Sequence, residues 1–152
     1  MNNQRQSITI LMADDDADDR FLTQEAFSES FLLHDLRFVE DGEELMAYLR
    51  HQGDYSEPDQ APRPEIILLD LNMPRKDGRE ALAEIKTDPT LRQIPIIIFT
   101  TSRDQKDIYQ SYDLGANSFM VKPTSFEELV HTLRSIEHYW FELVKLPPPT
   151  AA

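Results

Sequence analysis

The 152-residue sequence contains no cysteine, which excludes disulfide bonds, a thiolate nucleophile and a zinc site with Cys ligands. It also has few basic residues, because 15 Lys and Arg stand against 28 Asp and Glu and leave a net charge of −13. Nucleic-acid phosphates and anionic membrane surfaces attract Lys and Arg, so a chain this acidic is poorly suited to either. We therefore expect no direct contact with nucleic acid or with a membrane.

Long hydrophobic segments are missing as well. The polar residues 1–7 lead into an apolar run at residues 8–13, which is too short for a signal peptide or a membrane-spanning helix. We therefore expect a cytoplasmic protein. The length, with 40% hydrophobic and 28% charged residues, is typical of one globular domain. We expect that domain to cover residues 1–146, followed by a proline-rich tail at 147–152.

Short apolar segments alternate with amphipathic segments along the chain. Apolar runs of this length are typical of buried parallel strands, and the segments between them have helical spacing. Five strand–helix units in this order predict an α/β fold with a doubly wound parallel sheet and right-handed crossovers. The predicted strands are residues 8–13, 35–39, 65–69, 95–99 and 118–121, and the predicted helices are residues 18–30, 42–50, 78–88, 104–114 and 125–144.

Two segments exceed what a small α/β domain needs. The polar, proline-containing stretch 51–64 is longer than the usual connection, and it is either a tolerated surface insertion or a contact for a partner. The last predicted helix has an apolar stripe for the core, with Tyr139 and Phe141 on the flanks of that stripe and Leu143 and Leu146 beyond it. Because such a wide apolar face needs a second surface to bury it, we expect a homodimer through this helix.

Polar side chains stand where the predicted strands end. Asp14 and Asp15 follow the first strand, and Asp70 follows the third. Thr100 and Lys122 end the fourth and fifth strands. Because the carboxyl ends of parallel strands share one edge, where ligands bind, we expect these side chains to line one crevice. Carboxylates, a hydroxyl and an ammonium together suit a divalent cation and a phosphoryl group.

The acidic run after the first strand does not consist of ligands alone. Asp14 and Asp15 leave the strand directly and are the better ligand candidates, whereas Asp16 and Asp18 are suited to capping the next helix or facing solvent. The spacing of the run also matches the Ca²⁺-binding loop of an EF-hand. Asp19 argues against that loop, because it occupies the position where the loop requires Gly, and a strand instead of a helix precedes the run.

The residues allow more than one function for this crevice. A carboxylate held near Mg²⁺ can attack phosphorus, which makes Asp70 a candidate nucleophile. The spacing of Asp14 and Asp16 also matches the Asp-x-Asp of phosphohydrolases that use an aspartate nucleophile, and Asp14 would then be the nucleophile. A third possibility is an interaction module with a vestigial pocket.

A specific set of motifs stands on these strands. They are Asp14-Asp15, Leu69-Asp70-Leu71-Asn72-Met73-Pro74, Thr100, Phe119 and Lys122-Pro123. With this set, the sequence resembles the receiver domains of response regulators in two-component signalling over nearly all of residues 7–140. Three further features are the loop 51–64, Phe99-Thr100-Thr101-Ser102 and the ending 139–147. These features resemble the small Rcp-type regulators of cyanobacterial phytochromes.

The resemblance implies a flavodoxin-like sheet with the strand order 2-1-3-4-5. It implies a phosphoacceptor that is not an enzyme and that takes a phosphoryl group onto Asp70 from a sensor histidine kinase, here of the phytochrome type. Lys122 and Thr100 would bind the phosphoryl group, and Thr100 and Phe119 would form the switch. Phe119 stands where Tyr is common, so the switch would depend on packing without a phenolic hydroxyl. We expect the signal to pass through another protein or through dimerisation.

The resemblance also implies Mg²⁺ as the cofactor. Asp15 and Asp70 would bind the ion through their carboxylates, and Asn72 would bind it through its backbone carbonyl. Asp14 would act mainly through a bound water.

Overall fold

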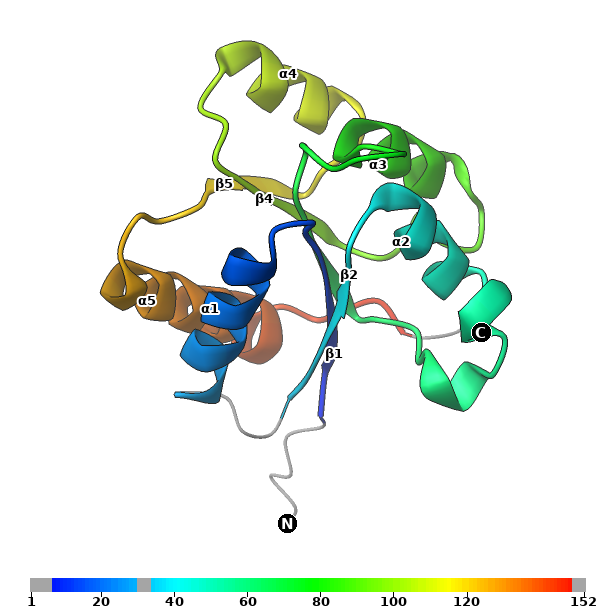
Figure 1. The fold of residues 1–152 in the computed structure, drawn as a ribbon, viewed down its shortest axis with the longest axis horizontal. Coiled ribbons are helices and arrows are strands. Elements are labelled where there is room, and N and C mark those ends of the chain that lie inside the picture. The colour runs from blue at the N-terminus through cyan, green and yellow to red at the C-terminus, as the bar shows by residue number, and fades with distance from the viewer. Residues whose placement is uncertain (1–6, 30–33, 149–152) are drawn as a thin grey trace.

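The computed structural model describes residues 7–29 and 34–148. Five parallel strands form one sheet in the order β2-β1-β3-β4-β5, and helices cover both of its faces (Figure 1). This is the predicted flavodoxin-like α/β fold, so the fold class and the strand order are confirmed. Within the described ranges, none of the helices has the length and apolar character needed to traverse a bilayer.

The five strands and the first four helices lie where the apolar periodicity predicts them and differ from the prediction only near their ends. The strands are β1 Thr9–Ala13, β2 Asp35–Val39, β3 Ile66–Leu69, β4 Ile96–Thr100 and β5 Ser118–Val121, and the helices are α1 Ala17–Ser28, α2 Gly42–Leu49, α3 Gly78–Thr87, α4 Gln105–Asp113 and α5 Phe126–Ile136. The predicted end of the first helix at residue 30, and residues 149–152 of the predicted tail, lie outside the described residues. The domain boundary at residue 146 stays a prediction.

Each of these five helices begins after a residue whose side chain accepts hydrogen bonds from the first-turn backbone N–H groups. Such capping satisfies donors that have no partner inside the helix. Asp16 is one of these caps, as the sequence predicts, and Asp18 is exposed. The capping residues are Asp16, Asp41, Asp77, Asp104 and Ser125.

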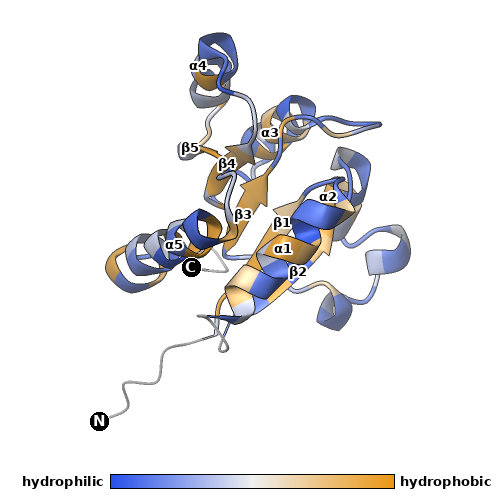
Figure 2. Cartoon of the chain, turned by 60° about the vertical axis from the view of Figure 1, so that its left-hand side comes forward, coloured by the Kyte–Doolittle hydropathy of each residue, from blue (hydrophilic) through white to orange (hydrophobic). Residues whose placement is uncertain are grey.

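The sheet separates two apolar clusters. Successive strand residues point to opposite faces, so Leu11 packs in one cluster with side chains of α2 and α3, while Met12 packs in the other with side chains of α1 and α5. Figure 1 shows α1 and α5 on one side of the sheet and α2, α3 and α4 on the other. Figure 2 shows the hydrophobic residues concentrated in the central strands. With both faces covered, the carboxyl edge of the sheet is left for a site.

The predicted α-helix 125–144 is wrong in its second half. The α-helix α5 ends at Ile136 and continues as a π-helix, η3 Glu137–Leu143. The wider turn is seen in the bond from Val144 N–H to the carbonyl of Tyr139 over 2.9 Å, which spans five residues. An apolar stripe predicted with 3.6 residues per turn does not stay on one face of the helix across such a wider turn. Phe141 therefore packs against the core cluster on the α1–α5 face of the sheet.

The stretch 51–64 contains two short 3₁₀ turns, η1 Gly53–Tyr55 and η2 Pro58–Gln60, and it packs against α2. The hydroxyl of Tyr55 donates to a Glu44 carboxylate oxygen over 2.6 Å, and the hydroxyl of Tyr48 donates to the carbonyl of Pro62 over 2.8 Å. Both of these bonds hold the insertion on its own domain. A contact with a partner stays a prediction.

Candidate functional site

The side chains predicted to line one crevice come together at the carboxyl edge of the sheet. Hydrogen bonds of the strand ladder continue beyond the strands: Asp70 N–H donates to the carbonyl of Ala13 over 3.0 Å, and Lys122 N–H donates to that of Thr100 over 2.7 Å. The residue after each strand is therefore as fixed as the strand itself. Gly78 allows α3 to begin close to this edge, because a Cβ there would lie 2.1 Å from the Asp70 carbonyl oxygen.

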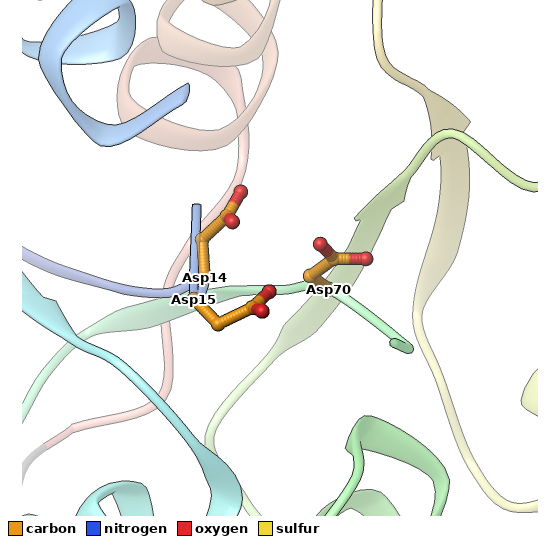
Figure 3. Close-up of side chains that lie close together, drawn as sticks. All are labelled: Asp14, Asp15 and Asp70. Carbon is orange, nitrogen blue, oxygen red and sulfur yellow. The ribbon is translucent and has the colours of Figure 1, made fainter. Parts of the chain in front are cut away.

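Three carboxylates form the centre of the crevice. Asp14, Asp15 and Asp70 can each place one oxygen so that all three lie within 4.8 Å of one another (Figure 3). We call this group the carboxylate triad. Asp14 and Asp70 are buried and Asp15 is exposed. The triad is typical of a divalent-metal site, and its oxygen-only ligands fit a hard cation that keeps water on its open side.

The ammonium of Lys122 lies against this triad. Its Nζ lies 2.6 Å from Asp14 Oδ2, 2.8 Å from Asp19 Oδ2 and 3.0 Å from Asp70 Oδ2. Burial alone would lower the pKa of Lys122, but its hydrogen bonds to Asp14 and Asp19 raise that pKa above the usual value. Lys122 is therefore a fixed positive charge in the crevice.

The carboxylate of Asp14 is enclosed on both sides. Asp14 Oδ1 accepts the backbone N–H of Asp16 over 2.9 Å, and its other oxygen accepts the ammonium of Lys122. Burial raises the pKa of Asp14, and the Lys122 ammonium offsets part of that rise. Both oxygens of Asp14 are thus already engaged by protein donors.

The two oxygens of Asp70 have different partners. Asp70 Oδ1 accepts the buried hydroxyl of Thr100 over 2.8 Å and, at 3.4 Å, the backbone N–H of Asn72. Asp70 Oδ2 accepts Lys122. From the sequence we expect Thr100 to bind a phosphoryl group. In this structure its hydroxyl contacts the Asp70 carboxylate itself. An approaching phosphoryl oxygen would have to replace that contact.

Phe119 lies on β5, next to the strand that carries Thr100, and packs, partly buried, against the core cluster on the α2–α3 face. Its backbone N–H donates to the hydroxyl of Tyr112, on α4, over 3.1 Å. The contacts of Tyr112 and Asp19 were not predicted from the sequence. The position of Asp19 in the sequence could have indicated that it lies near the site, because the first helical turn after a strand lies above the carboxyl edge of the sheet. No comparable local signal connects Tyr112 to Phe119.

A second polar cluster connects the β4–α4 loop to α3. The hydroxyl of Ser102 donates to Asp107 Oδ2 over 2.7 Å, and the guanidinium of Arg79 donates to Asp107 Oδ1 over 2.7 Å. The hydrogen bonds from Ser102 and Arg79 hold the pKa of Asp107 below its usual value. This cluster restrains the loop that follows Thr100.

Comparison with known proteins agrees with this geometry. A sequence model of the family "Response regulator receiver domain" matches residues 10–134. Response regulator Rcp1 of Synechocystis sp. is 43% identical over 138 residues, which are 91% of this chain and 92% of Rcp1. Among solved structures, the phosphorylated cyanobacterial phytochrome response regulator RcpA is 44% identical with a TM-score of 0.86. The Mn²⁺-bound form of Rcp1 is 42% identical with a TM-score of 0.83. Each match covers 93% of this chain and 99% of the solved chain.

Proposed function

Since this chain belongs to the response regulator receiver domain family, we propose that Asp70 accepts a phosphoryl group from a sensor histidine kinase. The chain is a receiver and not an enzyme, so the alternative of a phosphohydrolase with Asp14 as its nucleophile is set aside. The observation that carries the proposal is the placement of Asp70 between Thr100 and Lys122 in the carboxylate triad. The similarity to the cyanobacterial phytochrome response regulator RcpA supports a kinase of the phytochrome type.

The transfer needs few protein groups. One carboxylate oxygen of Asp70 forms the new bond to phosphorus while the bond from phosphorus to the histidine nitrogen of the kinase breaks, and that electron pair returns to the imidazole. Lys122 offers its ammonium to the phosphoryl oxygens, whose negative charge it neutralises. The hydroxyl of Thr100 leaves Asp70 Oδ1 and donates to a phosphoryl oxygen.

We infer that Mg²⁺ is the cofactor of this step. Asp15 and Asp70 would hold it through carboxylate oxygens and Asn72 through its backbone carbonyl. Asp14 would act mainly through a bound water. When bound, the ion supplies positive charge to the phosphoryl oxygens. The exposure of Asp15 supports the choice of Mg²⁺, since this ion keeps several of its waters.

The switch that we propose starts at Thr100. When its hydroxyl moves toward the phosphoryl group, the β4–α4 loop moves with it. Phe119, on the neighbouring strand, then fills the space that Thr100 leaves. The packing of Phe119 against the core supports this role. The negative charge added at Asp70 would thereby shift the balance between two arrangements of the β4–α4 loop and Phe119.

We also propose that the signal passes through protein contacts, including a homodimer at the end of the last helix. Tyr139 is 54% exposed and Leu143 is 63% exposed, and Tyr139 and Trp140 line a shallow groove beside Met120 of β5. The apolar surface is smaller than the sequence predicted, because Phe141 and also Leu146, which was expected beyond the core face, pack against the core cluster. The interface would therefore centre on Tyr139 and Leu143.

Phosphorylation can be tested directly. The protein is incubated with acetyl phosphate and Mg²⁺, and its intact mass is measured. We expect the wild type to gain one phosphoryl group, Asp70→Asn to gain none, and Asp59→Asn, which changes an exposed carboxylate in the insertion, to behave as the wild type. Peptide mapping that places the label on any residue other than Asp70 would contradict the proposal.

A further inference from the structure

Lys122 makes one contact that the proposed chemistry does not use. An ammonium has three N–H donors, and here three carboxylates surround it, those of Asp14, Asp70 and Asp19. Asp14 and Asp70 belong to the carboxylate triad, whereas Asp19 does not. Asp19 therefore binds Lys122 from outside the group of candidate metal ligands.

The position of Asp19 follows from the start of α1. Asp16 caps this helix and accepts the backbone N–H of Asp19 over 3.3 Å, which fixes the first turn above the end of β1. The side chain of Asp19 is 34% exposed, while that of Lys122 is only 9% exposed. A carboxylate with access to water does not depend on Lys122 for its solvation. It can hold the ammonium in every state of the site.

The other two contacts of Lys122 change when ligands arrive. A phosphoryl group on Asp70 takes up one of its oxygens and presents new oxygens to Lys122. A cation in the triad competes for the charge of Asp14. A long lysine side chain released from both carboxylates would regain its rotamer freedom and lie in the right place only part of the time.

We propose that Asp19 is a positioning residue, which holds the Lys122 ammonium beside Asp70 while the cation and the phosphoryl group bind and leave. This inference rests on the proposed phosphoryl transfer to Asp70. The competing explanation is a general one: an acidic residue in the first turn stabilises α1 through the helix dipole and adds negative charge near the site. Asp18 offers a matched control, because it is an acidic residue in the same turn with an exposed side chain.

The experiment compares Asp19→Ala, Asp18→Ala, Asp19→Glu and the wild type. Phosphorylation by acetyl phosphate is measured at saturating Mg²⁺ by intact mass, and Mg²⁺ affinity is measured by amide NMR shifts near Asp15. We expect Asp19→Ala to lower the saturated rate of phosphorylation by roughly tenfold or more, up to the roughly hundredfold cost of a catalytic group misplaced by about 1 Å, with a change in Mg²⁺ affinity of less than about twofold. Asp19→Glu should restore part of the rate, and Asp18→Ala should match the wild type.

A second measurement follows Lys122 itself. At saturating Mg²⁺ and without a phosphoryl donor, when a cation competes for the carboxylates of the triad, we expect the ¹⁵N signal of the Lys122 ammonium to be observable and slow to exchange in the wild type and in Asp18→Ala, and to be lost in Asp19→Ala. Equal rates and equal ammonium signals in Asp19→Ala and Asp18→Ala would overturn the role of Asp19. A loss of Mg²⁺ affinity as large as the loss of rate would overturn it too, because Asp19 would then be a ligand. A wild type that holds its Lys122 signal but takes no phosphoryl group would instead overturn the proposed function.

Discussion

The hydroxyl of Tyr112 accepts a hydrogen bond from the backbone N–H of Phe119 over 3.1 Å. Phe119 lies on β5, one of the two edge strands of the sheet, and residues 7–29 and 34–148 provide no further strand for its outward N–H groups. Tyr112 lies on α4, so the bond joins this helix to the strand that carries the proposed switch residue. The phenolic hydroxyl that Phe119 lacks is thus supplied by a different residue and reaches its backbone instead of its side chain.

Replacing Tyr112 by Phe should uncouple α4 from β5 with little damage to the fold. We expect a loss of about 0.5–1.5 kcal/mol in the free energy of unfolding, the usual net value of one hydrogen bond, because water can reach the freed N–H. We also expect smaller amide shifts on α4 when beryllofluoride is added. Urea unfolding and NMR measure the two effects. Tyr109→Phe, on the exposed side of the same helix, is the control, and identical behaviour of the two variants would contradict the prediction.

Lys122→Ala should still bind Mg²⁺ but lose the response to a phosphoryl mimic. Removal of the ammonium leaves the carboxylate triad more negative, which favours a cation, whereas the phosphoryl group loses a charged partner. The measurement is the amide shift of Thr100 and Phe119 on addition of beryllofluoride with Mg²⁺. Lys106→Ala, an exposed lysine on α4, should respond as the wild type does. A full response in Lys122→Ala would remove Lys122 from the switch.

Mg²⁺ binding should depend on Asp15 and Asp70 far more than on Asp18. We expect Asp15→Asn to weaken the affinity by about tenfold or more, since even residues that only support metal ligands often contribute that much. Asp18→Asn should change the affinity by less than about twofold, although it removes the same charge. Titration followed by amide NMR shifts or calorimetry gives both constants. Equal losses of Mg²⁺ affinity in the two variants would mean that the acidic residues after β1 bind the ion through their total negative charge and not as specific ligands.

Glu65 should make the stability depend on pH. Burial raises the pKa of its carboxyl above the ordinary value of 4.5. Because the folded state then binds the proton more tightly than the unfolded state, this contribution to stability is present below pH 4.5 and is lost as the pH rises through the folded pKa. Glu65→Gln can still accept the N–H of Thr9. It should therefore be more stable than the wild type at pH 7, with the difference vanishing at low pH in urea unfolding. A stability difference between Glu65→Gln and the wild type that grows toward low pH would contradict the predicted direction of the pH dependence.

The double variant Tyr139→Ser, Leu143→Ser should be monomeric if the end of the last helix forms the homodimer. Both side chains are exposed, so the fold of the domain should survive, whereas replacing Phe141 would disturb the core. Light scattering gives the mass with and without beryllofluoride. Phe21→Ser, at an exposed aromatic residue on α1, should stay dimeric. A wild type that is monomeric in both conditions would exclude the dimer, and a dimeric double variant would place the interface elsewhere.

Local periodicity was enough to predict most of the secondary structure. The alternation of apolar runs placed β1 to β5 and the starts of α2 and α3 because these runs must be buried on one or both faces, whatever the rest of the chain does. The same logic located the site, since residues that follow parallel strands share one edge. Asp14, Asp70 and Lys122 could therefore be placed together from their positions in the chain alone, while their chemical roles stay predictions.

Contacts between elements could not be predicted in this way. That Asp19 binds Lys122, and that Tyr112 reaches Phe119, depends on how α1 and α4 are set against the sheet. The π-helical turn after Ile136 could not be predicted either, because the sequence there continues a good α-helical stripe. The sequence by itself determined which faces are apolar and where the strands end. Only the tertiary structure decided which polar side chains meet, because the direction of each depends on the packing of elements far apart in the chain.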